Sequence, residues 1–313
     1  MISKTAKRQY VELTQVGNKF HNLNIVTEIF PEASICDLEF SGIDEKNEKL
    51  LLMEFIEQYD SESLMLLGDG GMGKTTLLFH ILESYYNCTA KFSQIPLYIE
   101  LNRCPSKLDS WCLDDKDSVF VEKYIAGLLK NEKNINKTDQ LIKDIQHEFQ
   151  KEPILGKPRY LILLDGLNEV AAGNSNGYSV RTILENEIIH SIQKYKNVRF
   201  VITSRNNSGQ IQGIKRIDIS GISKESIEAY LREEEKKGDI RNGITDEVLR
   251  NRALLKCLRI PLFLNMFGVI SGDTVITTRG EILREFFYKK RASLYSNKIE
   301  GDKISGFMLD FII

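Results

Sequence analysis

The sequence lacks an apolar stretch long enough to cross a membrane, and it has no excess of charge of either sign. No run reaches the roughly 18 uninterrupted apolar residues of a spanning helix. The opening residues MISKTAKRQYVELTQ also lack the apolar core of a secretion signal. Lysine and arginine number 42 against 44 aspartates and glutamates, so the net charge of −2 gives no field that attracts nucleic acid or anionic lipid to the whole chain. We therefore expect a cytoplasmic protein with no membrane partner and no strong nucleic-acid contact.

Cysteine is also scarce, and its positions follow no pattern. The five cysteines are an odd number, lie far apart and include no CxxC pair, which favours reduced thiols over a disulfide framework or a zinc site. The 313 residues are 42% hydrophobic and 27% charged, and this composition excludes collagen, mucin-like stalks and disordered linkers. A chain of this length holds about two folded units.

Short apolar runs alternate with helical patterns through the first two thirds of the chain. Strands that are almost continuous in valine, isoleucine and leucine are typical of a parallel sheet buried on both faces. We expect a helix over residues 44–58 and then an α/β fold, with a parallel five-stranded sheet flanked by helices. The expected strands are 63–67, 95–101, 159–165, 198–204 and 214–220, and the expected helices are 74–85, 118–130, 138–150 and 180–195.

A glycine-rich loop follows the first of these strands. The run GDGGMGKT fits the pattern GxxxxGK[ST] and lies between a strand and a helix, as that pattern requires. Glycines let the backbone N–H groups point inward, and the N-terminus of the next helix adds to this nest for phosphate oxygens. The sequence therefore predicts a P-loop NTPase whose nucleotide-binding residues include Gly68, Asp69, Gly70, Gly71, Met72, Gly73, Lys74, Thr75 and Thr76.

Charged and hydroxyl side chains in and after the strands are the candidates for catalysis. We expect Lys74 to reach the β- and γ-phosphates, and the hydroxyl of Thr75 to ligate Mg²⁺. Asp165 ends an apolar strand at the same sheet edge, so it is the second candidate ligand for Mg²⁺. Glu169, four residues later, is placed to polarise the attacking water. Arg205 follows the strand VRFVITS and is expected to reach the γ-phosphate, although a single arginine after a strand is often merely solvated.

Strand signals disappear after Gly221, where the pattern becomes helical. The expected helices there are 223–237, 245–258, 261–269 and 279–295. We predict an N-terminal extension of unclear role (1–44), a P-loop nucleotide-binding domain (45–221), a helical domain (222–272) and the start of a truncated winged-helix or linker region (273–313). The chain ends on the apolar run ISGFMLDFII, so we expect a piece of a longer protein.

Taken together, GDGGMGKTT, LLDGLNE, VITSR and the later RIPLFL resemble a NACHT domain of the STAND class of signalling ATPases, of bacterial type. The resemblance covers roughly residues 40 to 290. It implies an α/β nucleotide-binding domain, a small helical domain and a winged helix. In this family ADP holds a closed monomer and ATP permits assembly, with effector and sensor domains on either side that this chain does not show.

The resemblance also assigns residues. Lys74 and Thr75 match the phosphate and magnesium residues, Asp165 the magnesium acid, and Arg205 the sensor arginine. Pro261 matches the helical-domain proline that contacts the nucleotide, although proline is also ordinary at a helix start. The segment 38–43 (LEFSGI) is similar to the one that packs on the adenine.

Two departures from the family pattern affect the expected activity. Asn168 stands where members often have a second aspartate, which leaves Glu169 as the only candidate base and puts fast hydrolysis in doubt. The last histidine is His190, so the winged-helix histidine that commonly touches the β-phosphate of ADP is missing from these residues.

These features favour a slowly hydrolysing ATP switch that self-associates in its ATP state and acts in bacterial defence, including antiviral defence, or in stress signalling. An AAA+-like remodelling ATPase acting on DNA or protein is one alternative. A nucleotide-binding scaffold without hydrolysis is another alternative, and it is favoured by Asn168 in place of a second acid.

Overall fold

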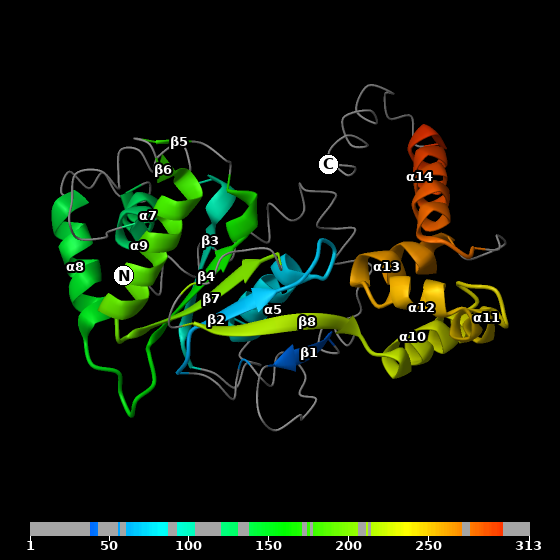
Figure 1. Ribbon diagram of the computed structural model, residues 1–313, viewed down its shortest axis with the longest axis horizontal. Helices are drawn as coiled ribbons and strands as arrows, with labels where there is room; N and C mark the ends of the chain where they lie inside the picture. The colour runs from blue at the N-terminus through cyan, green and yellow to red at the C-terminus, as the bar shows by residue number, and fades with distance from the viewer. Residues whose placement is uncertain are drawn as a thin grey trace. The chain divides into compact units, whose positions relative to one another are not determined.

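The chain forms two compact units, Met1–Ser220 and Gly221–Ile313. The computed structural model in Figure 1 describes residues 38–42, 56, 61–86, 93–103, 120–130, 138–170, 174–175, 178–205, 211, 214–270 and 276–296. Of the helix expected over residues 44–58, only Ile56 is among them, and it is helical and buried. The winged-helix or linker region expected from residue 273 is described only over residues 276–296, and the predicted boundary there stays a prediction.

A six-stranded sheet organises the first unit. The five predicted strands are confirmed, and every neighbouring pair among them is parallel. A sixth strand, formed by part of the segment expected to pack on adenine, is an outermost strand of the sheet. The order is β1 (Leu38–Gly42), β8 (Lys215–Ile222), β2 (Leu64–Leu67), β7 (Val198–Ser204), β4 (Tyr160–Asp165), β3 (Ile95–Glu100).

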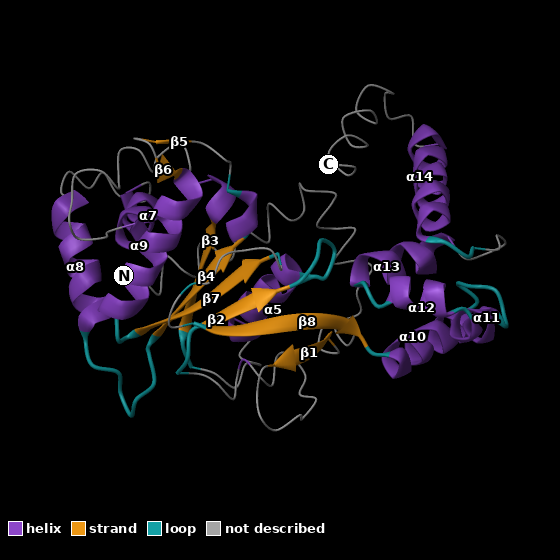
Figure 2. Ribbon diagram, in the orientation of Figure 1, coloured by secondary structure: helices purple, strands orange, loops and turns teal. Residues whose placement is uncertain are grey.

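Helices cover this sheet, as its apolar strands require (Figure 2). Alternate strand residues such as Met65, Leu67 and Ile162 form one core with the inner faces of three helices, α7 (Phe120–Lys130), α8 (Thr138–Gln150) and α9 (Val180–Lys194). The residues between them, such as Leu66 and Leu163, are buried on the opposite face. The helix α5 (Lys74–Tyr86) contacts β3 and β4. Two-residue strands β5 (Asn174–Ser175) and β6 (Tyr178–Ser179) add a small antiparallel pair that was not predicted.

The second unit is helical over the residues described. The single helix predicted over 245–258 is wrong, because the chain is extended at Asn251 (φ −93°, ψ 94°). The side chain of Asn251 accepts a hydrogen bond from the N–H of Leu254 at 3.1 Å, so it ends one helix and caps the next. The helices are α10 (Lys224–Lys237), α11 (Ile244–Arg250), α12 (Arg252–Leu258), α13 (Pro261–Ile270) and α14 (Arg279–Ser296).

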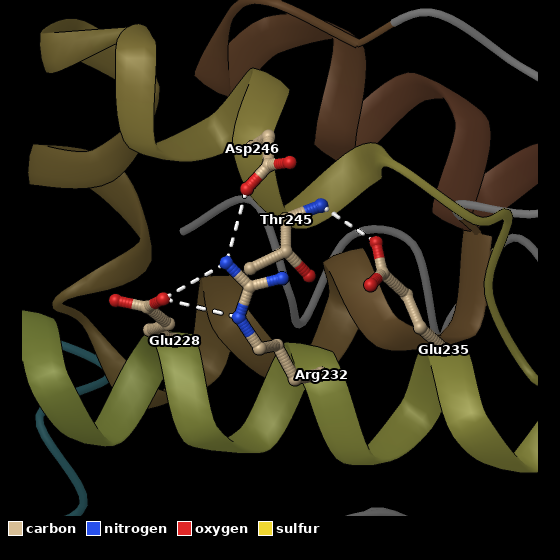
Figure 3. A network of polar contacts seen from close by, with 5 residues as sticks. All are labelled: Glu228, Arg232, Glu235, Thr245 and Asp246. Carbon is tan, nitrogen blue, oxygen red and sulfur yellow. Dashed lines mark hydrogen bonds and ion pairs between the residues drawn. The ribbon is translucent and has the colours of Figure 1, made fainter.

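A polar network joins α10 to α11 (Figure 3). The guanidinium of Arg232 donates to Glu228 and to Asp246, each at 3.0 Å. One turn further along α10, a carboxylate oxygen of Glu235 accepts the N–H of Thr245 at 2.9 Å. The ion pairs are exposed and contribute little each, whereas the Glu235 carboxylate satisfies an N–H in the first turn of α11. The network therefore fixes where α11 begins relative to α10.

No single helix in the described part of the chain has the length and apolar character needed to cross a bilayer. Only the bent pair α12 and α13 meets those criteria when the two are taken together.

Candidate functional site

The glycine loop lies where β2 ends and α5 begins. Gly71 and Gly73 have positive φ values of 82° and 77°, a conformation that residues with a side chain adopt at a cost. A hydrogen bond from the N–H of Gly68 to the carbonyl of Ser204 (3.3 Å) ties the loop to β7. The free N–H groups of the first turn of α5 follow directly, so this corner of the sheet is built to receive an anion.

Lys74 folds back over the loop that precedes it. Its ammonium donates to the carbonyls of Gly68 (2.6 Å) and Asp69 (2.9 Å). Burial lowers the pKa of Lys74, and the charge of Asp165 opposes that shift. Arg205 and Glu169 also act on this pKa, the first lowering it and the second raising it. The predicted catalytic residues thus lie within electrostatic reach of one another.

Asp165 accepts hydrogen bonds from three side chains of the site. Its side chain is buried at the end of β4, and one carboxylate oxygen, Oδ2, accepts hydrogen bonds from Thr75 Oγ1 (2.8 Å) and from the hydroxyl of Tyr98 (2.9 Å). The other oxygen, Oδ1, accepts a hydrogen bond from Thr203 Oγ1. Thr203 in turn accepts the N–H of Gly166 at 2.9 Å. Three hydroxyl donors therefore fix the orientation of this carboxylate.

Glu169 ends a short 3-10 turn, η2 (Leu167–Glu169), that follows β4. The turn is entered through Gly166, whose φ is 78°, and the carboxylate of Glu169 lies over it, since a Cβ placed on Gly166 would meet Oε2 at 3.2 Å. Burial is the main cause that raises the pKa of Glu169, and the negative charge of Asp165 adds to it. A carboxylate with a raised pKa is a better proton acceptor than an ordinary glutamate.

The backbone of Arg205 contacts the side chain of Asn168. The N–H of Arg205 donates to the amide oxygen of Asn168 at 3.0 Å. The positive charge of Arg205 lowers the pKa of Glu169, which places it near the acids. Asn168, the departure noted in the sequence, thus helps to fix where the chain leaves β7.

Three residues of this edge were not predicted as site residues. Tyr98 and Thr203 hydrogen-bond to Asp165 from the strands on either side. Glu100 ends β3 opposite Asp165 in the parallel register, and its charge also raises the pKa of Glu169. The sequence did carry a signal for Tyr98, because a tyrosine inside a buried strand needs a partner for its hydroxyl.

Pro261 and the segment 38–43 are the two further positions expected at the nucleotide. Pro261 is a buried residue at the start of α13 in the second unit, so its role stays a prediction. The backbone of residues 38–42 forms β1, and the side chains of the segment 38–43 lie outside the described residues. The contact of this segment with adenine therefore also stays a prediction.

The residues present fit a nucleotide with Mg²⁺. A threonine hydroxyl and a carboxylate, already 2.8 Å apart, are hard oxygen donors of the kind that Mg²⁺ prefers alongside phosphate oxygens and water. Within the described ranges no cluster of three or more histidine, cysteine, aspartate or glutamate side chains could hold a metal by itself. An ion held partly by a ligand's phosphates needs only the two donors that Thr75 and Asp165 supply.

Comparison with known proteins agrees with this geometry. The family model of the NACHT domain matches residues 62–237, more than half of the chain. No match is found among curated proteins. Two of the similar solved structures come from Pyrococcus species. A STAND protein with a tetratricopeptide repeat sensor from Pyrococcus horikoshii has 18% identity and a TM-score of 0.38, covering 76% of this chain and 31% of that one. A Walker-type ATPase of Pyrococcus abyssi has 12% identity and a TM-score of 0.44, covering 78% and 72%.

This chain thus spans less than a third of the STAND protein's length. Both TM-scores lie below 0.5, so the assignment rests on the family model and on the site itself. The matched region holds the phosphate loop, Asp165, Glu169 and Arg205, and all of it up to residue 220 belongs to the α/β unit that positions them. With the family model matching more than half of the chain, and with the loop, acids and arginine in their expected strand contexts, the chain belongs to the NACHT domain family of P-loop ATPases.

Proposed function

We propose that the chain binds ATP and ADP with Mg²⁺ at this sheet edge, hydrolyses ATP slowly, and acts as a signalling switch that self-associates in the ATP state. The observation that carries the proposal is that Thr75, Lys74 and Glu169 all interact with Asp165. The loop hydroxyl of Thr75 is bonded to it, and its charge acts on the pKa values of both Lys74 and Glu169. Defence or stress signalling in a bacterium is the role that fits the family.

The residues would divide the work as follows. Lys74 and the N–H groups of the loop bind phosphate oxygens, and Thr75 with Asp165 would hold Mg²⁺, which neutralises phosphate charge when bound. Tyr98 and Thr203 keep the Asp165 carboxylate turned toward Thr75. Glu169 accepts a proton from the attacking water, and Arg205 binds the terminal phosphate and distinguishes ATP from ADP.

Slow turnover follows from the position of Asn168. Its amide cannot accept a proton from water, and its oxygen is already bonded to the N–H of Arg205. Glu169 is therefore the candidate base that remains, and slow turnover suits a switch that must hold its nucleotide better than it suits a remodelling enzyme that must cycle.

The direct test is to denature the purified chain and to identify the nucleotide that is released by chromatography and mass spectrometry. We expect adenine nucleotide in near-stoichiometric amount, mostly ADP. Guanine nucleotide would contradict the ATP assignment. An initially empty chain that turns ATP over rapidly and is stimulated by DNA would contradict the switch and favour a remodelling ATPase.

Replacing Glu169 by glutamine should separate binding from hydrolysis. The amide keeps the shape of the side chain but cannot accept a proton, so turnover should fall about 100-fold while ATP affinity changes little. Because the pKa of Glu169 is raised, its carboxylate is protonated at a higher pH than that of an ordinary glutamate. Wild-type turnover should therefore begin to fall at a higher pH as the solution is acidified, and turnover of the variant should not show this acid-side decrease. The measurement is phosphate release against pH, together with ATP titration.

A matched control for this variant is Glu185→Gln, which removes a carboxylate paired with Arg181 on α9. That change should leave turnover within about twofold of wild type, as expected for a surface pair. Equal turnover in Glu169→Gln and wild type would remove Glu169 as the base. No turnover in either protein, with ATP still bound, would favour the scaffold without hydrolysis.

A further inference from the structure

A tight turn between α8 and β4 exposes two large aliphatic side chains. Ile154 is 78% exposed and Leu155 is 94% exposed, and we call these two residues the 154–155 tip. A bridge pairs Ile154 with Lys157, whose N–H donates to the carbonyl of Ile154 at 3.0 Å. In Figure 1 the green segment that joins α8 to β4 projects away from the helices and strands beside it. The tip is therefore a convex apolar point at the surface.

The tip has an unfavourable backbone conformation. Leu155 has a φ of 54° and is followed by Gly156 with a φ of 75°, so both central residues of the turn are left-handed. Turns of this kind favour asparagine or aspartate before the glycine, because a bulky side chain is strained there. Leu155 is the one residue other than glycine with positive φ in the described part of the chain. Strain and exposure both oppose folding stability, so stability does not explain a leucine here.

The tip stands on a rigid base. The side chain of the buried Asn197 accepts the N–H of Arg159 at 2.9 Å and donates to the carbonyl of Glu148 at 3.0 Å. Its backbone bonds to Phe149 and to Tyr160, so one residue joins the end of α8 to the start of β4. Pro153 and Pro158 bracket the turn, and each limits the backbone freedom of its neighbours.

Cations surround the base of the tip. Lys151 pairs with Glu148, and Lys196 pairs with Glu152 at 2.6 Å. Lys157 and Arg159 are exposed and add two further positive charges. The local balance is four cations against two acids, a net of +2, on a chain whose net charge is −2. The charged groups counted are Lys151, Lys157, Arg159, Lys196, Glu148 and Glu152.

We propose that the 154–155 tip inserts into the headgroup boundary of an anionic lipid bilayer, with the surrounding lysines and arginine on the lipid phosphates. Aliphatic side chains gain by entering the acyl boundary, and long cationic side chains keep their charges at the headgroups. A protein partner fits less well, because a stable protein interface buries about 800 Å² on each side, far more than two side chains on a convex turn can supply.

The position of the tip leaves the nucleotide site free. The tip precedes the first residue of β4, whereas Asp165 is the last, so the two lie at opposite ends of a strand about 20 Å long. The expectation of no membrane partner rests on the missing spanning segment and the near-neutral charge, and neither bears on a local, peripheral contact. Lipid binding by the tip is thus independent of the proposed switch.

The test is sedimentation of the purified full chain with vesicles of phosphatidylcholine containing phosphatidylserine, compared with phosphatidylcholine alone. We expect binding that needs phosphatidylserine and is weakened by salt. Leu155→Asn should reduce it about tenfold while keeping or raising the melting temperature, because asparagine tolerates positive φ. Tyr288→Asn, which removes another exposed large side chain (60% exposed), should change neither quantity, and Lys74→Ala should bind vesicles like wild type.

Three results would overturn the proposal. The first is a wild-type chain that does not sediment with the phosphatidylserine vesicles, and the second is vesicle binding by Leu155→Asn that equals that of wild type. The third is concentration-dependent self-association that Leu155→Asn abolishes without any lipid binding, which would make the tip a protein contact. Loss of binding in Leu155→Asn with an intact melting curve supports the lipid site, because misfolding cannot then explain it.

Discussion

Replacing Lys74 by alanine should abolish measurable nucleotide binding. The side chain carries the one cation of the phosphate loop, and it is half-buried among the loop carbonyls and the charges of Asp165 and Glu169. Losing a partly buried, charge-assisted contact costs about 4 kcal/mol, which corresponds to roughly a 1,000-fold loss of affinity for ATP. Equilibrium titration with a fluorescent ATP analogue would measure this loss, and chromatography of the denatured variant should find it empty of nucleotide.

The same variant needs a check on its fold, because Lys74 also binds the carbonyls of Gly68 and Asp69. Lys74→Arg keeps the positive charge but not the compact ammonium, and it should bind ATP weakly while unfolding like wild type. Lys157→Ala, at the opposite edge of the sheet, removes a lysine without touching the loop and should bind ATP normally. An ATP affinity in Lys74→Ala close to that of wild type would refute the phosphate assignment.

The central part of the sheet could be predicted from the sequence because its strands are largely apolar runs between helical patterns. Runs such as YLILL on β4 are buried on both faces, and only a central parallel strand tolerates such a composition. The phosphate loop was equally well specified, since glycine spacing and the strand before it leave few other conformations. The sixth strand, β1, could not be predicted in this way, because LEFSG has no continuous apolar run and reads as irregular.

The donors around Asp165 were missed for a different reason. Tyr98 and Thr203 are far from Asp165 in the chain, and they meet it only because β3 and β7 are the two neighbours of β4. Strand alternation can tell which face a residue occupies, but it cannot tell which strands are adjacent. Strand order depends on how the helical connections between parallel strands pack on the sheet, and the sequence pattern indicates this only indirectly.

The break at Asn251 shows the limit of periodicity in the helical unit. The apolar residues on either side follow a helical spacing, so a single helix over 245–258 was the natural prediction. The side chain of Asn251 accepts the N–H of Leu254 and starts a new helix there. Asparagine is a favoured N-cap residue but is also tolerated inside helices. Whether the chain forms one continuous helix or breaks at Asn251 therefore depends on tertiary packing.

Replacing Gly221 by alanine should cause the largest loss of stability in the second unit. Gly221 lies near the end of β8 with a φ of 96°, and a Cβ there would sit 2.4 Å from the carbonyl oxygen of Arg259. That oxygen cannot easily move, because it accepts the N–H of Ile222 at 2.8 Å and the guanidinium Nε of Arg259 donates back to the carbonyl of Ile222 at 3.2 Å. Backbone strain and the clash together should cost about 4 kcal/mol.

Gly238→Ala is the matched control for this change. Gly238 has a φ of 80°, close to that of Gly221, but a Cβ there would meet nothing within 4 Å. It should therefore cost only the left-handed strain, about 1 kcal/mol, and the difference between the two variants isolates the contact with Arg259. Calorimetric unfolding would measure both losses. Equal shifts in the two variants would mean that the turn before α13 gives way easily, and that the contact between Gly221 and Arg259 is softer than its hydrogen bonds imply.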